Sequence, residues 1–364
     1  MPNLPPPSDP VPLSIERNMA ARSLLPSHKP LLDFFRHALT TFQSTERPTP
    51  FRVVCTLTPH PAPGSPAQLL QHRILAPSPT AQPPHVPPSR LVVLDSSFNP
   101  PSAAHLRMAR EAVLAEVERE GSGGKKGGGG VRLLLLLAVK NADKAAKPAG
   151  FEQRLAMMWA FARDVRRTLE EGEEGNARTG VAIDVALTTH PFFHAKSAAI
   201  AEDGFYKGTE VGGQRGGGEE TEQVILAGYD TLIRIFDPKY YGTPSEVSEV
   251  SSAGKAPIRI ALDPFFKRAR LRVTMRTDDE WGGRDEQAAY LERLLRGDEL
   301  EKIGGSREWA ERIEMVDGRK EGEPVVSSTL AREAAKRRDW GRLRELVPSE
   351  VGKWIEREGL YADA

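Results

Sequence analysis

A serine and a histidine stand where a buried strand gives way to a helix, and both could bind an anion. Residues 91–94 form an apolar run typical of a buried parallel strand, and two prolines at 100 and 101 interrupt it. Apolar side chains then recur at helical spacing, so Ser102 is expected at the helix start and His105 in its first turn. Backbone N–H groups and the positive end of the helix dipole converge there. This pattern predicts a site for the phosphates of a nucleotide, although Ser102 could equally serve only as a helix cap.

A second polar set opens a helix near the C-terminus and consists of Ser327, Ser328, Thr329 and Arg332. One hydroxyl is enough to cap a helix, so the others could meet phosphate oxygens. Arg332 lies one turn further on and could reach the same place with a planar fork of donors. The simpler alternative is an ordinary capped helix with a solvated arginine.

Other candidates follow predicted strands. Gly228 and Asp230 come after an apolar run at 224–227, where the glycine could end a strand and the aspartate could cap a helix. Lys140 and Lys144 follow the apolar run at 131–139, at a sheet edge where phosphates would gather. Either lysine could also be merely solvated.

Strands and helices alternate along the part of the chain that carries these residues. Strands are predicted at 91–95, 131–139, 181–187, 224–227, 271–275 and 312–316, and the best-defined helix covers 151–169. Such alternation indicates an α/β fold, with a parallel sheet covered by helices on both faces.

Several segments are too rich in Gly, Pro, Ser or charge to join a core. We expect a disordered tail at 1–29, an accessory helix and strand at 30–58 that packs on the core, and a Pro-rich linker at 59–89. The main domain then covers 90–361. It is interrupted by flexible insertions at 121–130, 204–220 and 241–257.

Composition limits the possible partners. Fifty Lys and Arg balance fifty Asp and Glu, so no net positive field draws the chain to nucleic acid or to an anionic membrane. No apolar stretch approaches the ~20 residues that span a bilayer. Cys55 is the single cysteine, which excludes an internal disulfide and a cysteine-based zinc site. We therefore expect a reducing compartment, the cytoplasm, with the nucleus as a further location.

The first site resembles the opening motif of the nucleotidylyltransferase superfamily. That motif is a strand, then Gly-x-Phe-x-Pro, then His/Thr-x-x-His at a helix start. Here it is matched by the strand at 91–95 with Phe98, Pro100, Ser102 and His105.

Two further motifs follow in the superfamily's order. The strand at 224–227 with Gly228 and Asp230 is similar to its strand followed by Gly-x-Asp. Residues 326–332, Val-Ser-Ser-Thr-Leu-Ala-Arg, match Ile-Ser-Ser-Thr-x-x-Arg and favour adenylyltransferases over their cytidylyl relatives. The likeness covers residues 90–361 and is greatest to the nicotinamide mononucleotide adenylyltransferases, especially a divergent fungal branch. It implies a Rossmann-like, doubly wound sheet.

The resemblance also implies roles. His105 and Arg332 would be catalytic, acting on phosphate oxygens. The residues that would bind ATP and its phosphates are Ser97, Phe98, Ser102, Lys140, Lys144, Gly228, Asp230, Ser327, Ser328 and Thr329.

Two departures from the family bear on these roles. Ser96 stands where a glycine usually opens the first motif, so the backbone would approach the phosphates less closely. The family typically stacks nicotinamide on a tryptophan, and the corresponding residues 188–196 have none. Phe192 or Phe193 would bind the acceptor instead.

The implied reaction joins nicotinamide mononucleotide (NMN) to the AMP part of ATP, giving NAD and pyrophosphate without a covalent intermediate. Mg²⁺ would accompany ATP, with no metal site of the protein's own. Two alternatives remain open. One is the same chemistry with another phosphorylated acceptor or with CTP. The other is a nucleotide-binding regulatory protein that hydrolyses ATP weakly.

Overall fold

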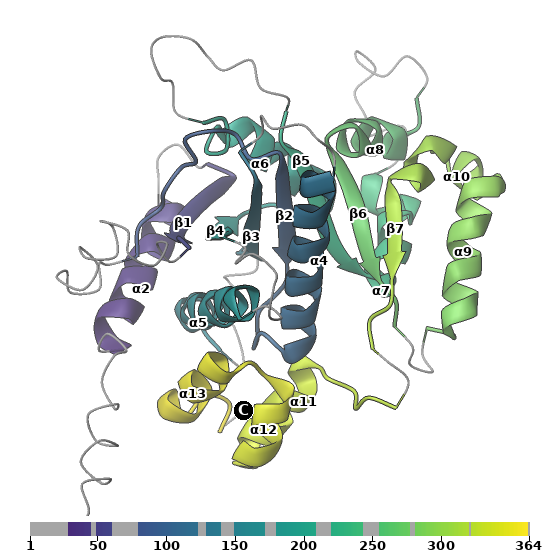
Figure 1. Cartoon of the computed structure of the whole chain (residues 1–364). Helices are drawn as coiled ribbons and strands as arrows, with labels where there is room; N and C mark the ends of the chain where they lie inside the picture. The colour runs from purple at the N-terminus through teal and green to yellow at the C-terminus, as the bar shows by residue number, and fades with distance from the viewer. Residues whose placement is uncertain are drawn as a thin grey trace, which may run out of the picture.

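A single sheet organises the part of the chain that the structure describes. The computed structural model describes residues 28–44, 49–59, 79–122, 129–139, 149–171, 180–208, 220–242, 255–276, 281–319 and 322–362. Its seven-stranded sheet has the order β1-β4-β3-β2-β5-β6-β7 (Figure 1). The strands are β1 (Phe51–Leu57), β2 (Arg90–Asp95), β3 (Val131–Ala138), β4 (Ala182–Thr188), β5 (Glu222–Gly228), β6 (Ala269–Thr274) and β7 (Ile313–Val316). All neighbours pair in parallel except β1, which runs antiparallel to β4.

The central strands β2 and β3 are mostly apolar because both faces of the sheet are covered. Alternate residues of β2 point to opposite sides, with Val92 and Leu94 in one core and Leu91 and Val93 in the other. Strand β3, Val-Arg-Leu-Leu-Leu-Leu-Leu-Ala, is divided between the two cores in the same way. An apolar run in the sequence predicts such a strand, because a strand that is buried on both faces needs apolar side chains on both.

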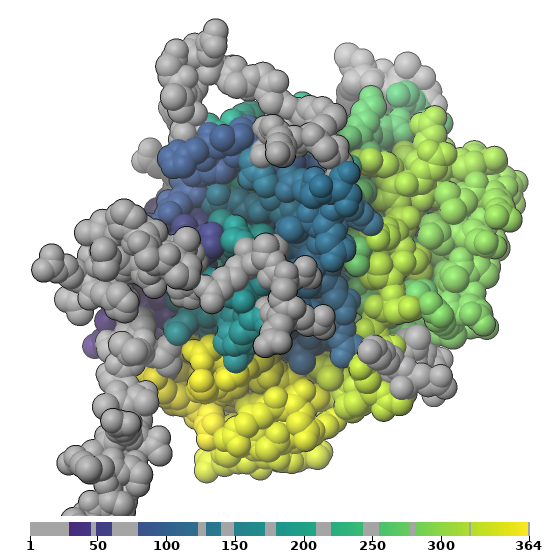
Figure 2. Space-filling model, in the orientation of Figure 1, coloured from purple at the N-terminus to yellow at the C-terminus, as the bar shows by residue number. Residues whose placement is uncertain are grey.

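Helices form a layer on each face. One face carries α2 (His28–Ser44), α4 (Ala103–Ser122), α5 (Phe151–Glu170), α11 (Ser328–Lys336), α12 (Trp340–Leu346) and α13 (Ser349–Glu358). The other carries α6 (Phe193–Asp203), α7 (Tyr229–Ile235), α8 (Pro257–Arg268), α9 (Arg284–Arg296) and α10 (Glu299–Lys302). Of the C-terminal helices, yellow in Figure 2, α13 packs against α5, and α12 packs against both α11 and α13. The prediction of a doubly wound parallel sheet is confirmed.

The chain order creates a crevice between β2 and β5. From β2 the chain crosses through α4 to β3 on one side of the sheet, whereas β5 lies on the other side of β2. The direction of winding therefore reverses between β2 and β5. Ligands of open α/β sheets bind outside the carboxyl ends of the strands at such a point.

The N-terminal segment adds to the edge of the sheet. Strand β1 pairs with β4, and α2 packs against α5. Thr80, in the segment predicted as a linker, accepts a hydrogen bond from Thr56 of β1 at 2.9 Å, so the described end of that segment lies on the core. Residues 1–27 of the predicted tail, residues 60–78 of the linker and most of the three predicted insertions lie outside the described residues.

A buried ion pair joins β3 to β4 at the end of the sheet opposite the crevice. Arg132 Nε lies 2.6 Å from Asp184 Oδ2, and Thr56 and Tyr206 donate hydrogen bonds to the same carboxylate at 2.6 and 3.0 Å. Every oxygen of this carboxylate is therefore paired, as burial of a charge requires.

Among the described helices, none is long and apolar enough to cross a membrane.

Candidate active site

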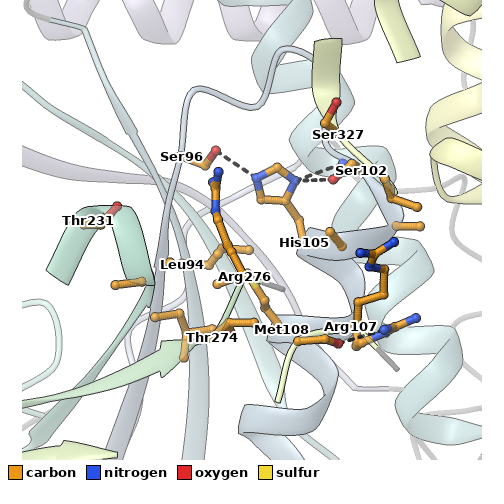
Figure 3. Close-up of a pocket in the computed structure, with 18 of the residues that line it drawn as sticks. Leu94, Ser96, Ser102, His105, Arg107, Met108, Thr231, Thr274, Arg276 and Ser327 are labelled. Atoms are coloured by element: carbon orange, nitrogen blue, oxygen red, sulfur yellow. Dashed lines mark hydrogen bonds between the residues drawn. The ribbon is translucent and has the colours of Figure 1, made fainter. Parts of the chain in front are cut away.

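A cavity of about 440 Å³ opens at the carboxyl ends of β2, β5 and β6. The first turns of α4 and α7 and the segment leading into α11 complete its walls. Figure 3 shows Ser96 and His105 facing each other there, with Arg276 between the two sides of the site. The cavity thus occupies the crevice that the strand order predicts.

His105 is held by both of its ring nitrogens. Its Nδ1 lies 3.0 Å from the backbone N–H of Ser102 and 2.8 Å from the Ser102 hydroxyl, and its Nε2 lies 3.0 Å from the hydroxyl of Ser96. A backbone N–H can only donate, so Nδ1 is the acceptor and the proton of the neutral ring sits on Nε2. Ser102, predicted to bind phosphate, is buried and fixes this tautomer.

The charge of His105 follows from its surroundings. Desolvation by burial, followed by the nearby charge of Arg276, lowers the pKa of His105 from 6.5 to about 4. Burial and a neighbouring cation both disfavour the imidazolium. At neutral pH the ring is therefore an uncharged hydrogen-bond donor toward the cavity.

The turn between β2 and α4 packs Phe98 against the buried side of His105. Phe98 has a positive φ of 46° and its side chain is fully buried. Its ring lies under His105, with centroids 6.0 Å apart, and contacts Phe161 at 6.2 Å. Phe98, predicted to contact ATP, therefore places its side chain in the core beneath the site, while Ser97 is exposed on the turn.

The start of α11 docks on the same turn. Ser327 caps the helix by accepting from the N–H of Leu330 at 3.2 Å, and Ser328 donates to the carbonyl of Pro100 at 2.8 Å. Both serines also line the cavity. Ser327 is thus used as a helix cap, and Ser328 holds α11 against the first motif.

Arg332 makes the second link between α11 and the turn. It donates to the Asn99 carbonyl at 2.8 Å and to the Thr329 hydroxyl at 3.0 Å. Tyr361 also donates to the Asn99 side chain, at 2.9 Å. Neither Arg332 nor Thr329 lines the cavity in this arrangement, although both lie beside its wall.

Gly228 and Asp230 stand at the end of β5 and the start of α7. A Cβ on Gly228 would lie 2.7 Å from Asp230 Oδ1, so any larger residue there would displace the Asp230 carboxylate. Oδ1 is buried and accepts no hydrogen bond in the described structure, although Arg276 Nε lies 3.2 Å away. A buried carboxylate oxygen in this state can accept from a ligand hydroxyl.

Arg276, at the end of β6, is a cavity residue that sequence reasoning missed. Its backbone N–H donates to the buried side chain of Gln287 at 3.0 Å, and Gln287 also donates to the Arg276 carbonyl. Gln287 thereby fixes where the arginine leaves the strand. The available signal was its position directly after a predicted strand, as for the residues after β2 and β5.

The two candidate acceptor-binding phenylalanines lie in different places. Phe193 lines the cavity, and the ammonium of Lys196 lies 5.2 Å from its ring centroid. Lys196 also forms a buried ion pair with Asp95, a cavity residue that the sequence did not single out. Phe192 is 41% exposed and stacks instead on His194, 5.8 Å between centroids.

Two of the predicted phosphate-binding residues cannot be placed, and the described residues hold no cluster of metal ligands. Lys140 and Lys144 lie outside the described residues. Within the described ranges, no three His, Cys, Asp or Glu side chains converge as metal ligands would. The described cavity instead offers hydroxyl, imidazole and guanidinium donors, a set that suits phosphate oxygens.

No family model matches the chain. Over 261 residues it is 31% identical to a Schizosaccharomyces pombe protein named "Putative nicotinamide mononucleotide adenylyltransferase", covering 72% of this chain and 82% of the relative. Among solved structures it aligns with Plasmodium falciparum nicotinic acid mononucleotide adenylyltransferase complexed with APC at 8% identity and a TM-score of 0.40, covering 76% of this chain and 98% of that one. Thermotoga maritima TmcAL bound with alpha-thio ATP aligns at 13% identity and a TM-score of 0.31, covering 74% and 56%.

Proposed function

The chain belongs to the nicotinamide mononucleotide adenylyltransferase family of nucleotidyltransferases, and from this premise we propose that it transfers AMP from ATP to NMN, giving NAD and pyrophosphate. The fungal relative supports an adenylyltransferase of NAD synthesis. The choice of NMN as acceptor is our proposal.

One observation carries this proposal. The N-termini of α4 and α11 meet at the same cavity, where Ser96 and His105 form a hydrogen-bonded pair and Arg276 supplies a positive charge. Two helix N-termini with an adjacent cation form an anion site, because their N–H groups and dipoles point at the ligand. A triphosphate meets both ends of such a site at once.

The chemistry needs positioning more than a protein nucleophile. An oxygen of the acceptor's 5′-phosphate attacks the α-phosphorus of ATP, and the bond from that phosphorus to the bridging oxygen of pyrophosphate breaks. The hydrogen-bonded pair of Ser96 and His105 stabilises charge on the α-phosphate oxygens. The start of α11, which Arg332 holds against the turn after β2, would bind the leaving pyrophosphate. ATP would bind together with Mg²⁺, which would supply positive charge to its phosphates.

The two sugar-bearing parts have separate partners. Asp230 would accept hydrogen bonds from the adenosine ribose through Oδ1, which accepts no hydrogen bond in the described structure. Phe193 would stack on the nicotinamide ring, with its own ring steadied by Lys196. The exposed Phe192 takes no part in this arrangement.

A direct assay tests the proposal. Purified protein is mixed with Mg²⁺, one nucleoside triphosphate and one acceptor, and products are separated by chromatography. ATP and CTP are each paired with NMN, nicotinate mononucleotide and an unrelated sugar phosphate. We expect NAD from ATP and NMN, with equal release of pyrophosphate. Release of phosphate from ATP without a dinucleotide product would instead support the regulatory alternative.

A further inference from the structure

Ser96 occupies a position in the first motif where the family usually has glycine, and its side chain points at His105. Its hydroxyl lies 3.0 Å from His105 Nε2, as the dashed line in Figure 3 shows. Its backbone N–H donates to the Leu136 carbonyl at 3.3 Å, which anchors Ser96 at the end of β2. The hydroxyl therefore stands at a fixed place between the imidazole and the cavity.

The direction of this hydrogen bond follows from the other side of the ring. The Ser102 N–H donates to Nδ1, so the neutral ring carries its proton on Nε2. Nε2 must then donate, and Ser96 Oγ must accept. Ser96 Oγ accepts this hydrogen bond with a lone pair, so its own hydroxyl proton is not donated to His105.

The hydroxyl proton of Ser96 can be donated toward the cavity. Ser96 lines the cavity, and the group that approaches it there, Arg276, is a cation with no acceptor to offer. Among the described residues no group accepts the hydroxyl proton, so an oxygen of the incoming substrate can accept it. A hydroxyl that already accepts a hydrogen bond is also a better donor, because the two bonds polarise each other.

We propose that Ser96 is the residue that touches the substrate, donating its hydroxyl proton to an oxygen of the α-phosphate while it accepts the Nε2 proton of His105. His105 then acts through Ser96 as a positioning residue, and no proton is transferred between the two side chains. This inference rests on the proposed adenylyl transfer. A serine in place of the usual glycine would therefore let Ser96, and not His105, contact the α-phosphate.

The first test compares kinetic constants of three variants. Ser96→Ala removes the bridge, and losing one preorganised donor to developing charge costs on the order of a hundredfold in rate. We expect kcat to fall at least tenfold and the KM for ATP to change less. Ser96→Thr keeps the hydroxyl and should retain most of the rate. Ser96→Gly should behave like Ser96→Ala. If Ser96→Ala or Ser96→Gly matches or exceeds the parent, the hydroxyl does not bridge and the proposal is wrong.

A double-mutant cycle separates a relay from two independent contacts. If Ser96 and His105 act in series, adding Ser96→Ala to His105→Ala should reduce kcat by less than about threefold, because the bridge has already lost its support. Independent contacts would instead multiply their losses in the double variant. All variants should first be shown to melt like the parent.

A binding experiment keeps this inference distinct from the proposed reaction. Histidine is labelled with ¹⁵N, and Mg²⁺–ATP is added while the Nε2 resonance of His105 is followed. The relay predicts a shift on ATP addition in the parent and its loss in Ser96→Ala. A shift that persists in Ser96→Ala means direct contact with His105 and overturns the proposal. Failure of the parent to make NAD would refute the proposed acceptor or reaction, while this spectrum would still decide the role of Ser96.

Discussion

We predict that His105 in the nucleotide-free protein stays neutral far below the pH at which histidine usually titrates. Burial and the charge of Arg276 lower its pKa from 6.5 to about 4. In the unfolded chain it should titrate at about its ordinary value, since neither effect survives unfolding. Lowering the pH therefore protonates the unfolded state first.

The sign and size of the effect follow from this difference. Between pH 6.5 and 4 the unfolded chain binds more protons at this site, so acid favours unfolding. The stability that the neutral His105 contributes is fully present above pH 6.5. It declines as the pH falls and is lost below about pH 4. The gap corresponds to at most about 3 kcal/mol in the free energy of unfolding, at 1.36 kcal/mol per pH unit. His105 is partly exposed toward the cavity, so a value of about 1 to 3 kcal/mol is expected.

Urea unfolding of the parent and of His105→Gln tests this prediction. Glutamine does not titrate, and all other ionisable groups are shared, so the difference between the two free energies isolates His105. That difference should change by about 1 to 3 kcal/mol in favour of the variant between pH 7 and pH 4.5. Proton NMR of the nucleotide-free parent should show one histidine that titrates near pH 4. A pH-independent difference, or titration of His105 near pH 6.5, would refute the reasoning.

Three further results are expected from the geometry. Arg332→Lys should lower kcat at least tenfold, measured by NAD formation, because a point charge cannot reproduce the forked contacts; parental kcat and ATP affinity would remove Arg332 from the site. Phe193→Ala should raise the KM for NMN severalfold and leave that for ATP nearly unchanged, whereas the matched Phe192→Ala should alter neither. Arg132→Met should destabilise the fold by about 3 to 5 kcal/mol in urea unfolding, because it leaves the buried carboxylate of Asp184 unpaired, and adding Asp184→Leu should recover part of that loss.

The strands could be predicted because each is a run with a clear physical signature. Residues 131–138 are almost continuously apolar, and burial on both faces of the sheet requires such a run. The helix predicted at 151–169 ends within one residue of α5, since its apolar side chains recur on one face. The helix α8 was not singled out. It carries Pro264 inside it and follows a segment rich in Gly, Ser and Pro, both of which usually mark loops.

The contacts of the site were harder to predict because they join distant parts of the chain. Lys196 pairs with Asp95 across 101 residues, and nothing local to either residue indicates the other. Arg276 reaches Asp230 because β5 and β6 are adjacent strands, a fact that follows from the sheet order and not from the motif itself. Local motifs identified the segments, whereas topology decides which side chains meet.

The residues at the start of α11 show why a motif can be found without its mechanism. Surplus hydroxyls there predicted phosphate contacts, yet Ser327 caps the helix and Ser328 bonds to the turn after β2. These bonds bring the free N–H groups of α11 to the cavity, where they can meet pyrophosphate oxygens with the helix dipole behind them. The side chains thus build the anion site whether or not they touch the anion. Replacing Ser328 should consequently weaken catalysis through the position of α11, even if its hydroxyl never contacts ATP.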